Sequence, residues 1–310
     1  MICDLRKFAE LLQLATKAFM KKQSKFENRR PRTSVQNKET TKTPKTNRDN
    51  SFSAASFSPS ALRQPVIYGV LPILEALRAE TRKIEKIFVV EGANENRLSN
   101  VLSLARQNGI LFQKISRANL SDFVEDNVNH QGIVAFVASA EYFNADKLID
   151  EISSRENSLS VILDGVEDPR NLGAILRVVE CVGAEGVFIP ERRAVGLTET
   201  VAKSSAGATE YVKVAKVANL NRLIEKLQEN NVWVVGTSAE ATMNYDDWDW
   251  KQSTVLVLGG EGKGLHRLVA EKCDVLVKIP LHGKIESLNV SVAAGVILFE
   301  AVKQRRLLDL

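Results

Sequence analysis

Short apolar runs alternate with helix-length segments through the second half of the chain, and this alternation constrains the fold more than any other feature. Strands are expected at Val161–Leu163, Gly186–Ile189, Val232–Gly236, Val255–Leu258 and Val275–Ile279. Helices are expected at about Leu172–Val182, Leu220–Glu229, Leu265–Glu271 and Val290–Arg305. Continuous apolar strands separated by helices are typical of a parallel sheet that is covered on both faces. The pattern predicts an α/β domain whose ligands bind beyond the carboxyl ends of the strands.

A smaller α/β unit is predicted upstream, from Tyr68 to Val137. Its helices are expected at Gly69–Arg78, up to about Gln107 and near Asn119–Val124, and its strands at Ile87–Val90, Ile110–Phe112 and Gly132–Ala138. Asn108-Gly109 is a helix-ending pair. We therefore predict a small domain over residues 64–139, a partly helical linker over residues 140–158 and a larger domain over residues 159–310.

The N-terminal segment has a different composition from the rest of the chain. The net charge is +4, yet residues 21–63 alone carry eleven Lys or Arg against three Asp or Glu. Their few large apolar side chains cannot offset the entropy of ordering, so we predict a disordered basic extension over residues 1–63. Such a tail either is a solvent-exposed extension without a binding role or attracts RNA through contacts with the RNA phosphates. A cytoplasmic location is expected, unless residues 1–60 are an organellar transit peptide.

Cysteine and histidine usage makes several classes of protein improbable. Three cysteines in no CxxC spacing argue against disulfides and thiolate metal sites: Cys3, Cys181 and Cys273. The histidines are far apart in the sequence, so no metal site is predicted: His130, His266 and His282. Because no run of eighteen apolar residues occurs, no membrane span is expected either.

The first of three loops that follow predicted strands runs from Asp164 to Asn171. Asp168-Pro169 predicts a turn, and Asn171 is placed either to cap the next helix or to bind a ligand. Arg177 follows among apolar neighbours. Its guanidinium either reaches solvent from a half-buried helix or grips a phosphate or ribose.

The other two loops are rich in glycine and in capping residues. Gly259–Gly264 lacks the GxxxxGK[ST] pattern of a triphosphate loop, and Glu261 within it is either a solvated turn residue or a functional one. Before the last helix, Ser287 and Asn289 are both cap-type residues. They cannot cap one helix in the same way, so one of them has spare hydrogen-bonding capacity.

Together these segments resemble the SpoU family of RNA ribose methyltransferases, in the SPOUT superfamily. The three motifs occur in family order at Asn171–Arg177, at Gly259–Gly264 and from Ile279-Pro280 through Ser287–Ala293. The upstream segments Ile67-Tyr-Gly-Val, Ile87-Phe-Val-Val and His130-Gln-Gly-Ile resemble the substrate-binding domain of the RlmB-type enzymes, which methylate a guanosine of 23S rRNA. The resemblance covers about residues 65–308 and leaves residues 1–63 outside.

The resemblance implies a SPOUT parallel-sheet domain with a deep trefoil knot, S-adenosylmethionine as cofactor, no metal and a homodimer. The matching positions imply catalytic roles for Asn171, Arg177, Glu261, Ser287 and Asn289. They imply cofactor contacts at Thr237, Gly259, Gly260, Ile279, Leu281 and Leu288. In the family the position of Arg177 is implicated in activating the ribose hydroxyl, with an RNA phosphate assisting, and the other catalytic positions hold the reacting groups in place.

The expected function is therefore transfer of a methyl group to a ribose 2'-hydroxyl of RNA, with a 23S rRNA guanosine as the expected target. Two alternatives stay open: a tRNA ribose methyltransferase, and a non-catalytic RNA-binding factor of ribosome assembly. A nicotinamide dehydrogenase is disfavoured because the loop Gly165–Arg170 has no GxGxxG pattern. The sequence does not specify the modified nucleotide or the general base.

Overall fold

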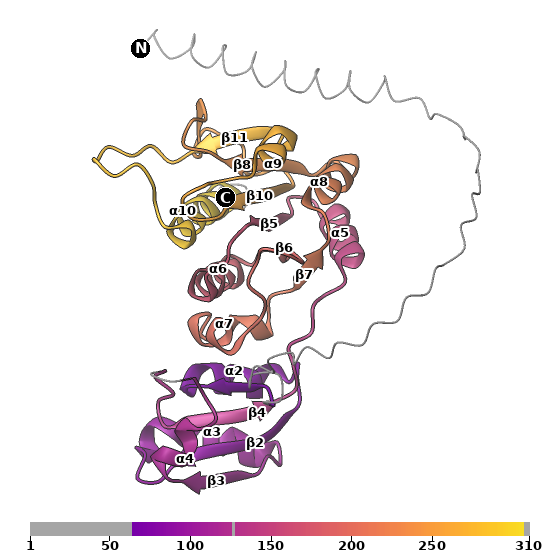
Figure 1. Cartoon of the computed structure of the whole chain (residues 1–310). Coiled ribbons are helices and arrows are strands. Elements are labelled where there is room, and N and C mark those ends of the chain that lie inside the picture. The colour runs from indigo at the N-terminus through magenta and orange to yellow at the C-terminus, as the bar shows by residue number, and fades with distance from the viewer. Residues whose placement is uncertain (1–63, 126–127, 307–310) are drawn as a thin grey trace, which may run out of the picture. The chain divides into compact units, whose positions relative to one another are not determined.

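The structure, a computed structural model, describes residues 64–125 and 128–306 (Figure 1). The predicted basic extension over residues 1–63 lies outside this range. Two sheets organise the described residues, one of four strands and one of seven. The α/β prediction is confirmed for both.

The smaller sheet has the order β1-β4-β2-β3. Its strands are β1 (Val66–Tyr68), β2 (Ile84–Val90), β3 (Phe112–Ile115) and β4 (Ile133–Val137), and its helices are α2 (Val70–Ala79), α3 (Glu95–Gln107) and α4 (Arg117–Ser121). Strand β4 is antiparallel to both neighbours, whereas β2 and β3 are parallel. The carboxyl ends of β2 and β3 therefore meet at one edge, where side chains of Asn94 and Ser116 cap α3 and α4.

The larger sheet has the order β7-β6-β5-β10-β8-β11-β9, and every pairing in it is parallel. Its strands are β5 (Leu159–Asp164), β6 (Val187–Pro190), β7 (Val214–Val217), β8 (Trp233–Thr237), β9 (Met243–Asn244), β10 (Thr254–Gly259) and β11 (Val275–Lys278). The five predicted strands are confirmed, and they form the centre of the sheet. The edge strands β7 and β9 were not predicted.

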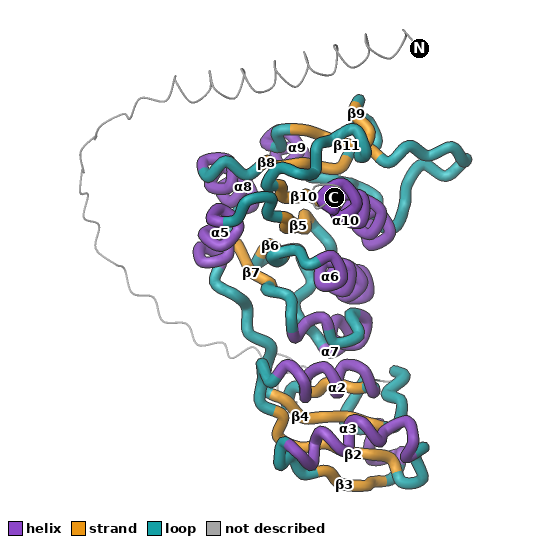
Figure 2. The backbone as a smooth tube through the Cα atoms, turned by 180° about the vertical axis from the view of Figure 1, so that it is seen from behind, coloured by secondary structure: helices purple, strands orange, loops and turns teal. Residues whose placement is uncertain are grey.

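Helices cover both faces of this sheet (Figures 1 and 2). One face carries α6 (Pro169–Val182) and α10 (Val290–Arg306), and the other carries α5 (Ala145–Ser154), α8 (Leu220–Glu229) and α9 (Arg267–Lys272). Each face has its own apolar core, one around Leu176 and Ile297 and one around Ile152 and Ile224. The predicted linker over residues 140–158 thus includes α5, which packs on the sheet.

Helix α7 (Glu199–Ser204) and the 3-10 turn η2 (Ala208–Glu210) contact the small domain. Ala202 of α7 lies within the apolar core formed by α2, α3 and β2. The buried carboxylate of Glu210 accepts hydrogen bonds from Thr81 Oγ1 at 2.9 Å and from Arg82 Nε at 3.0 Å. Apolar packing and a buried ion pair thus connect the two sheets.

The order of the central strands decides where a ligand can bind. Strand β10 lies between β5 and β8, although both precede it in the sequence. The carboxyl ends of β5, β8, β10 and β11 therefore share one edge, and all three predicted motif loops meet there.

The trefoil knot stays a prediction from the family resemblance. No helix in residues 64–125 or 128–306 has the length and apolar character needed to cross a membrane.

Candidate functional site

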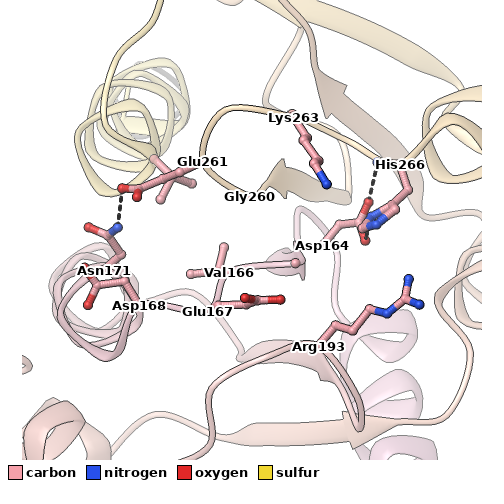
Figure 3. Close-up of a pocket in the computed structure, with 13 residues that line it drawn as sticks. Asp164, Val166, Glu167, Asp168, Asn171, Arg193, Gly260, Glu261, Lys263 and His266 are labelled. Carbon is pink, nitrogen blue, oxygen red and sulfur yellow. Dashed lines mark hydrogen bonds and ion pairs between the residues drawn. The ribbon is translucent and has the colours of Figure 1, made fainter.

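A cavity of about 630 Å³ opens at the carboxyl ends of β5 and β10. Its wall is formed by the loop after β5, the glycine-rich loop after β10 and the start of α10 (Figure 3). The polar lining residues are Asp164, Glu167, Asp168, Asn171, Arg193, Glu261, Lys263 and His266. The first two predicted motifs therefore face one cavity.

Of the two alternatives for Asn171, the start of α6 rules out the helix cap. The cap is Asp168, whose carboxylate accepts a hydrogen bond from Arg170 N at 2.8 Å. Pro169 occupies the first helical position, which favours a helix start at this point because proline has no N–H to satisfy. Asn171 consequently lies inside the helix, with its buried side chain free to bond elsewhere.

Asn171, Glu261 and Asn289 form a closed hydrogen-bond network. Asn171 Nδ2 donates to Glu261 Oε1 at 2.5 Å, and Asn289 Nδ2 donates to the same oxygen at 3.1 Å. Asn289 Nδ2 also donates to Asn171 Oδ1 at 3.0 Å. Meanwhile Asn289 Oδ1 accepts from Ser291 N at 2.8 Å and so caps α10. Each of the three motifs thus contributes one residue to the network, and each of these residues is hydrogen-bonded to the other two.

Close backbone packing explains the glycines at the end of β10. A Cβ on Gly260 would lie 2.2 Å from Gly165 O, and one on Gly259 would lie 2.1 Å from the carbonyl carbon of Gly264. Gly260 N also donates to Asp164 O at 2.8 Å. Only glycine permits these approaches, which bring Glu261 towards α6.

Asp164 and His266 hold the other end of the cavity and were not predicted as site residues. The buried Asp164 carboxylate accepts from His266 N at 2.8 Å and lies 2.9 Å from His266 Nδ1. Lys263 and Arg193 also line this end (Figure 3). In the sequence, only the position of Asp164 at the end of an apolar strand marks it as a possible site residue. No local pattern links it to His266, because 102 positions separate the two residues.

The predicted cofactor positions lie at the same edge of the sheet. Thr237 ends β8 and donates from Oγ1 to Val257 O at 3.2 Å, while Ile279 directly follows β11. Leu281 and Leu288 are exposed in the loop before α10. Within the described residues, the main chain of residues 279–288 makes no hydrogen bond. This loop therefore offers apolar side chains and unpaired main-chain groups to a ligand.

Two predicted residues lie apart from the network. Arg177 is exposed on α6 and does not line the cavity, as its helical position requires. Six residues separate it from Asn171, which amounts to about 9 Å along the axis and about 240° around it. Ser287 is exposed and has no hydrogen bond among the described residues, so it is the cap-type residue with spare capacity. No group of three potential metal ligands occurs in residues 64–125 or 128–306.

Two family models match separate parts of the chain. Residues 158–299 match the SpoU rRNA Methylase family, and residues 66–143 match the family described as RNA 2'-O ribose methyltransferase substrate binding. The Bacillus subtilis protein YacO, named as a TrmH family tRNA/rRNA methyltransferase, is 44% identical over 77% of this chain and 95% of its own. The Vibrio cholerae 23S rRNA (guanosine-2'-O-)-methyltransferase RlmB is 42% identical over 77% of this chain and 97% of its own.

Solved structures are similar over a comparable span. A crystal structure titled RNA 2'-O ribose methyltransferase has a TM-score of 0.66 at 26% identity, covering 80% of this chain and 91% of the other. The AdoMet-bound rRNA methyltransferase from Sinorhizobium meliloti has a TM-score of 0.64 at 26% identity, covering 79% of this chain and 88% of the other.

Proposed function

Because the chain belongs to the SpoU family of RNA methyltransferases, we propose that it transfers a methyl group from S-adenosylmethionine to a ribose 2'-hydroxyl of RNA. The observation that carries this proposal is the network of Asn171, Glu261 and Asn289, which joins all three family motifs at one cavity. A non-catalytic RNA-binding protein would have no need to keep these three polar side chains bonded to one another beside a cavity.

The residues at the edge of the large sheet fit S-adenosylmethionine. An adenosine needs apolar surface and hydrogen bonds to its ring, and the loop of residues 279–288 supplies exposed leucines and unpaired main-chain groups. We assign cofactor contacts to Thr237, Gly259, Gly260, Ile279, Leu281 and Leu288. When bound, the cofactor supplies an electrophilic methyl group on a sulfonium.

The protein side chains then have to place and activate the ribose. A 2'-hydroxyl is a weak nucleophile, so it must be held in line with the methyl group and relieved of its proton. Glu261 is held by two amide donors, and its carboxylate can accept a hydrogen bond from a ribose hydroxyl. Asn171 and Asn289 fix that carboxylate, while the exposed hydroxyl of Ser287 is free to contact substrate or cofactor.

We infer that Arg177 reaches the reacting hydroxyl from a second copy of the chain, because it does not line the cavity of its own chain. We therefore propose a homodimer formed through α6 and α10, which pack on each other. Val292 and Phe299 of α10 are exposed and apolar, as residues buried by a second subunit would be. The guanidinium would stabilise the developing alkoxide, with an RNA phosphate assisting.

The proposed target is a guanosine of 23S rRNA, supported by the similarity to RlmB over both domains. A tRNA ribose is the second candidate, because YacO is named for tRNA and rRNA together. The test is methylation of in vitro transcripts of 23S rRNA and of tRNA by the purified full chain, with 2'-O-methyl sites mapped by primer extension. Methylation at a base or at no position of either RNA would refute the proposal.

Complementation between inactive variants tests the dimer. Arg177→Ala and Asn289→Ala should each be inactive alone. If Arg177 acts across the interface, random heterodimers contain one intact site, and the mixture should recover about a quarter of the parental activity. If the mixture stays inactive while sedimentation confirms heterodimers, Arg177 does not act from the second subunit.

A further inference from the structure

A second cavity, of about 470 Å³, lies in the small domain and has no part in the proposed chemistry. It opens at the carboxyl ends of β2 and β3, between the loop after β2, the first turns of α3 and α4, and the turn before β4. Its polar side chains are Glu91, Asn94, Arg97, Ser116, Arg117 and Gln131. Asn94 and Ser116 accept hydrogen bonds as helix caps, and the two arginines are the cationic donors among these residues.

Neither arginine, Arg97 or Arg117, has an ion-pair partner within residues 64–125 and 128–306, although Glu91 also lines the cavity. Arg78 in the same domain, by contrast, pairs with Glu75 at 2.8 Å. Two guanidinium groups that line one cavity and form no ion pair with a described carboxylate can bind an anion together.

Lys203 of α7 lies beside this cavity, next to one of the residues that line it. A Cβ on Gly69 would lie 2.1 Å from Lys203 Nζ and 3.1 Å from Gln131 Oε1, so the ammonium sits beside a residue that lines the cavity. The ammonium also lies 5.9 Å from the centre of the Tyr68 ring. This half-buried lysine has no ion-pair partner among residues 64–125 and 128–306. A partly desolvated cation without a partner is destabilising until an anion binds.

The positive groups face one another closely enough to interact. Burial lowers the pKa of Lys203, and the charge of Arg97 lowers it further. Burial likewise lowers the pKa of His130, with Arg117 and Lys203 adding to the effect. His130 Nδ1 accepts from Gly132 N at 3.1 Å, which also favours the neutral ring. Among the described residues, Arg97, Arg117 and Glu91 therefore line the cavity, and Lys203 lies beside it.

We propose that Arg97, Arg117 and Lys203 bind a backbone phosphate of the RNA substrate, a proposal that rests on the proposed function for the identity of the ligand. Phosphate oxygens accept several charge-assisted hydrogen bonds at once, which two guanidinium groups and an ammonium can provide. Lys203 lies on α7, which packs against α6, the helix that carries Asn171.

The test is the salt dependence of RNA binding by the full chain, measured by filter binding to an in vitro transcript of 23S rRNA without cofactor. Removal of one phosphate-binding cation should reduce the slope of log K against log[salt] by about 0.7 to 0.9. Arg97→Gln and Arg117→Gln, both at exposed positions, should each lower the slope by about that amount. The triple variant with Lys203→Gln should lower it by about 2 to 3.

The matched control is Arg106→Gln, which removes the same charge from the opposite end of α3. Its slope should equal that of the parent. The variants with a single arginine replaced should keep the parental melting temperature, and all variants should keep the parental affinity for S-adenosylmethionine. An unchanged slope in the triple variant, or an equal reduction in Arg106→Gln, overturns the site. If the parent binds the transcript without methylating it, the proposed function fails while the slopes still decide this inference. No RNA binding by the parent overturns both.

Discussion

Substituting alanine for Gly260 should push apart two backbone segments that meet at the cavity. The new Cβ would lie 2.2 Å from Gly165 O and 2.9 Å from Gly165 C, and neither atom belongs to a flexible side chain. An ordinary contact begins at 3.4 Å, so the loop after β10 has to move by about 1.2 Å. That movement also breaks the hydrogen bond from Gly260 N to Asp164 O, now 2.8 Å long.

The expected magnitude follows from these two changes. Overpacking typically costs about 1–3 kcal/mol, and the broken hydrogen bond costs about 1 kcal/mol. The free energy of unfolding should therefore fall by about 2–4 kcal/mol. Activity should fall further. Glu261 directly follows the displaced residue, and a shift of about 1 Å in a positioning group can cost about a hundredfold in rate. The carboxylate would move away from Asn171 and Asn289.

Single-turnover methylation and urea denaturation measure both effects. The control is Gly262→Ala in the same loop, where a Cβ meets nothing within 4 Å. Because Gly262 has a φ of +80°, alanine there should cost about 1–2 kcal/mol of backbone strain without displacing Glu261. If Gly260→Ala turns over within about threefold of the parent, or no more slowly than Gly262→Ala, the positioning argument is wrong.

Three further predictions concern other parts of the molecule. Arg177→Ala should slow single-turnover methylation by more than about a hundredfold at saturating cofactor, while calorimetry shows unchanged cofactor binding; near-parental turnover would exclude a catalytic role. Glu210→Ala should destabilise the chain by about 3–5 kcal/mol in urea denaturation, because it leaves Arg82, whose side chain is only 10% exposed, without its partner. Burial raises the pKa of Cys273 to about 12, so its thiolate fraction at pH 8.5 is very small. Iodoacetamide should therefore label the exposed Cys181 before Cys273, as peptide mass spectrometry would show; equal labelling of these two would contradict the burial of Cys273.

The central strands of the large sheet could be predicted because each is an apolar run buried on both faces, as in β5 and β10. The edge strand β7 could not, because half of it faces solvent and its sequence Val-Ala-Lys-Val has no long apolar run. Helix α7 was missed for a related reason. It is a single short helix, and burial of Val201 and Ala202 against the rest of the protein stabilises it.

The site could be predicted only as far as local patterns extend. Asn171 and Asn289 were recognised as cap-type residues, and Asn289 does cap α10. Asn171 does not, because Asp168 and Pro169 start α6 three residues earlier than expected. The bond between Asn171 and Asn289 spans 118 positions, so only the family resemblance connected them. Nothing in the sequence pointed to His266 as the partner of Asp164.

The late arrival of β10 has a consequence for synthesis of the chain on the ribosome. Strands β5 and β8 flank β10 but are translated before it, so each emerges with an unpaired edge. From Asp164 to Gly259, elongation at about 5–20 residues per second takes on the order of 5–20 s. During that interval the apolar edge of β5 is open to pairing with other nascent chains, and the edge of β8 is open as well once Thr237 has been translated. Slow codons just upstream of Thr254 should therefore lower the soluble yield more than the same codons placed after Gly259.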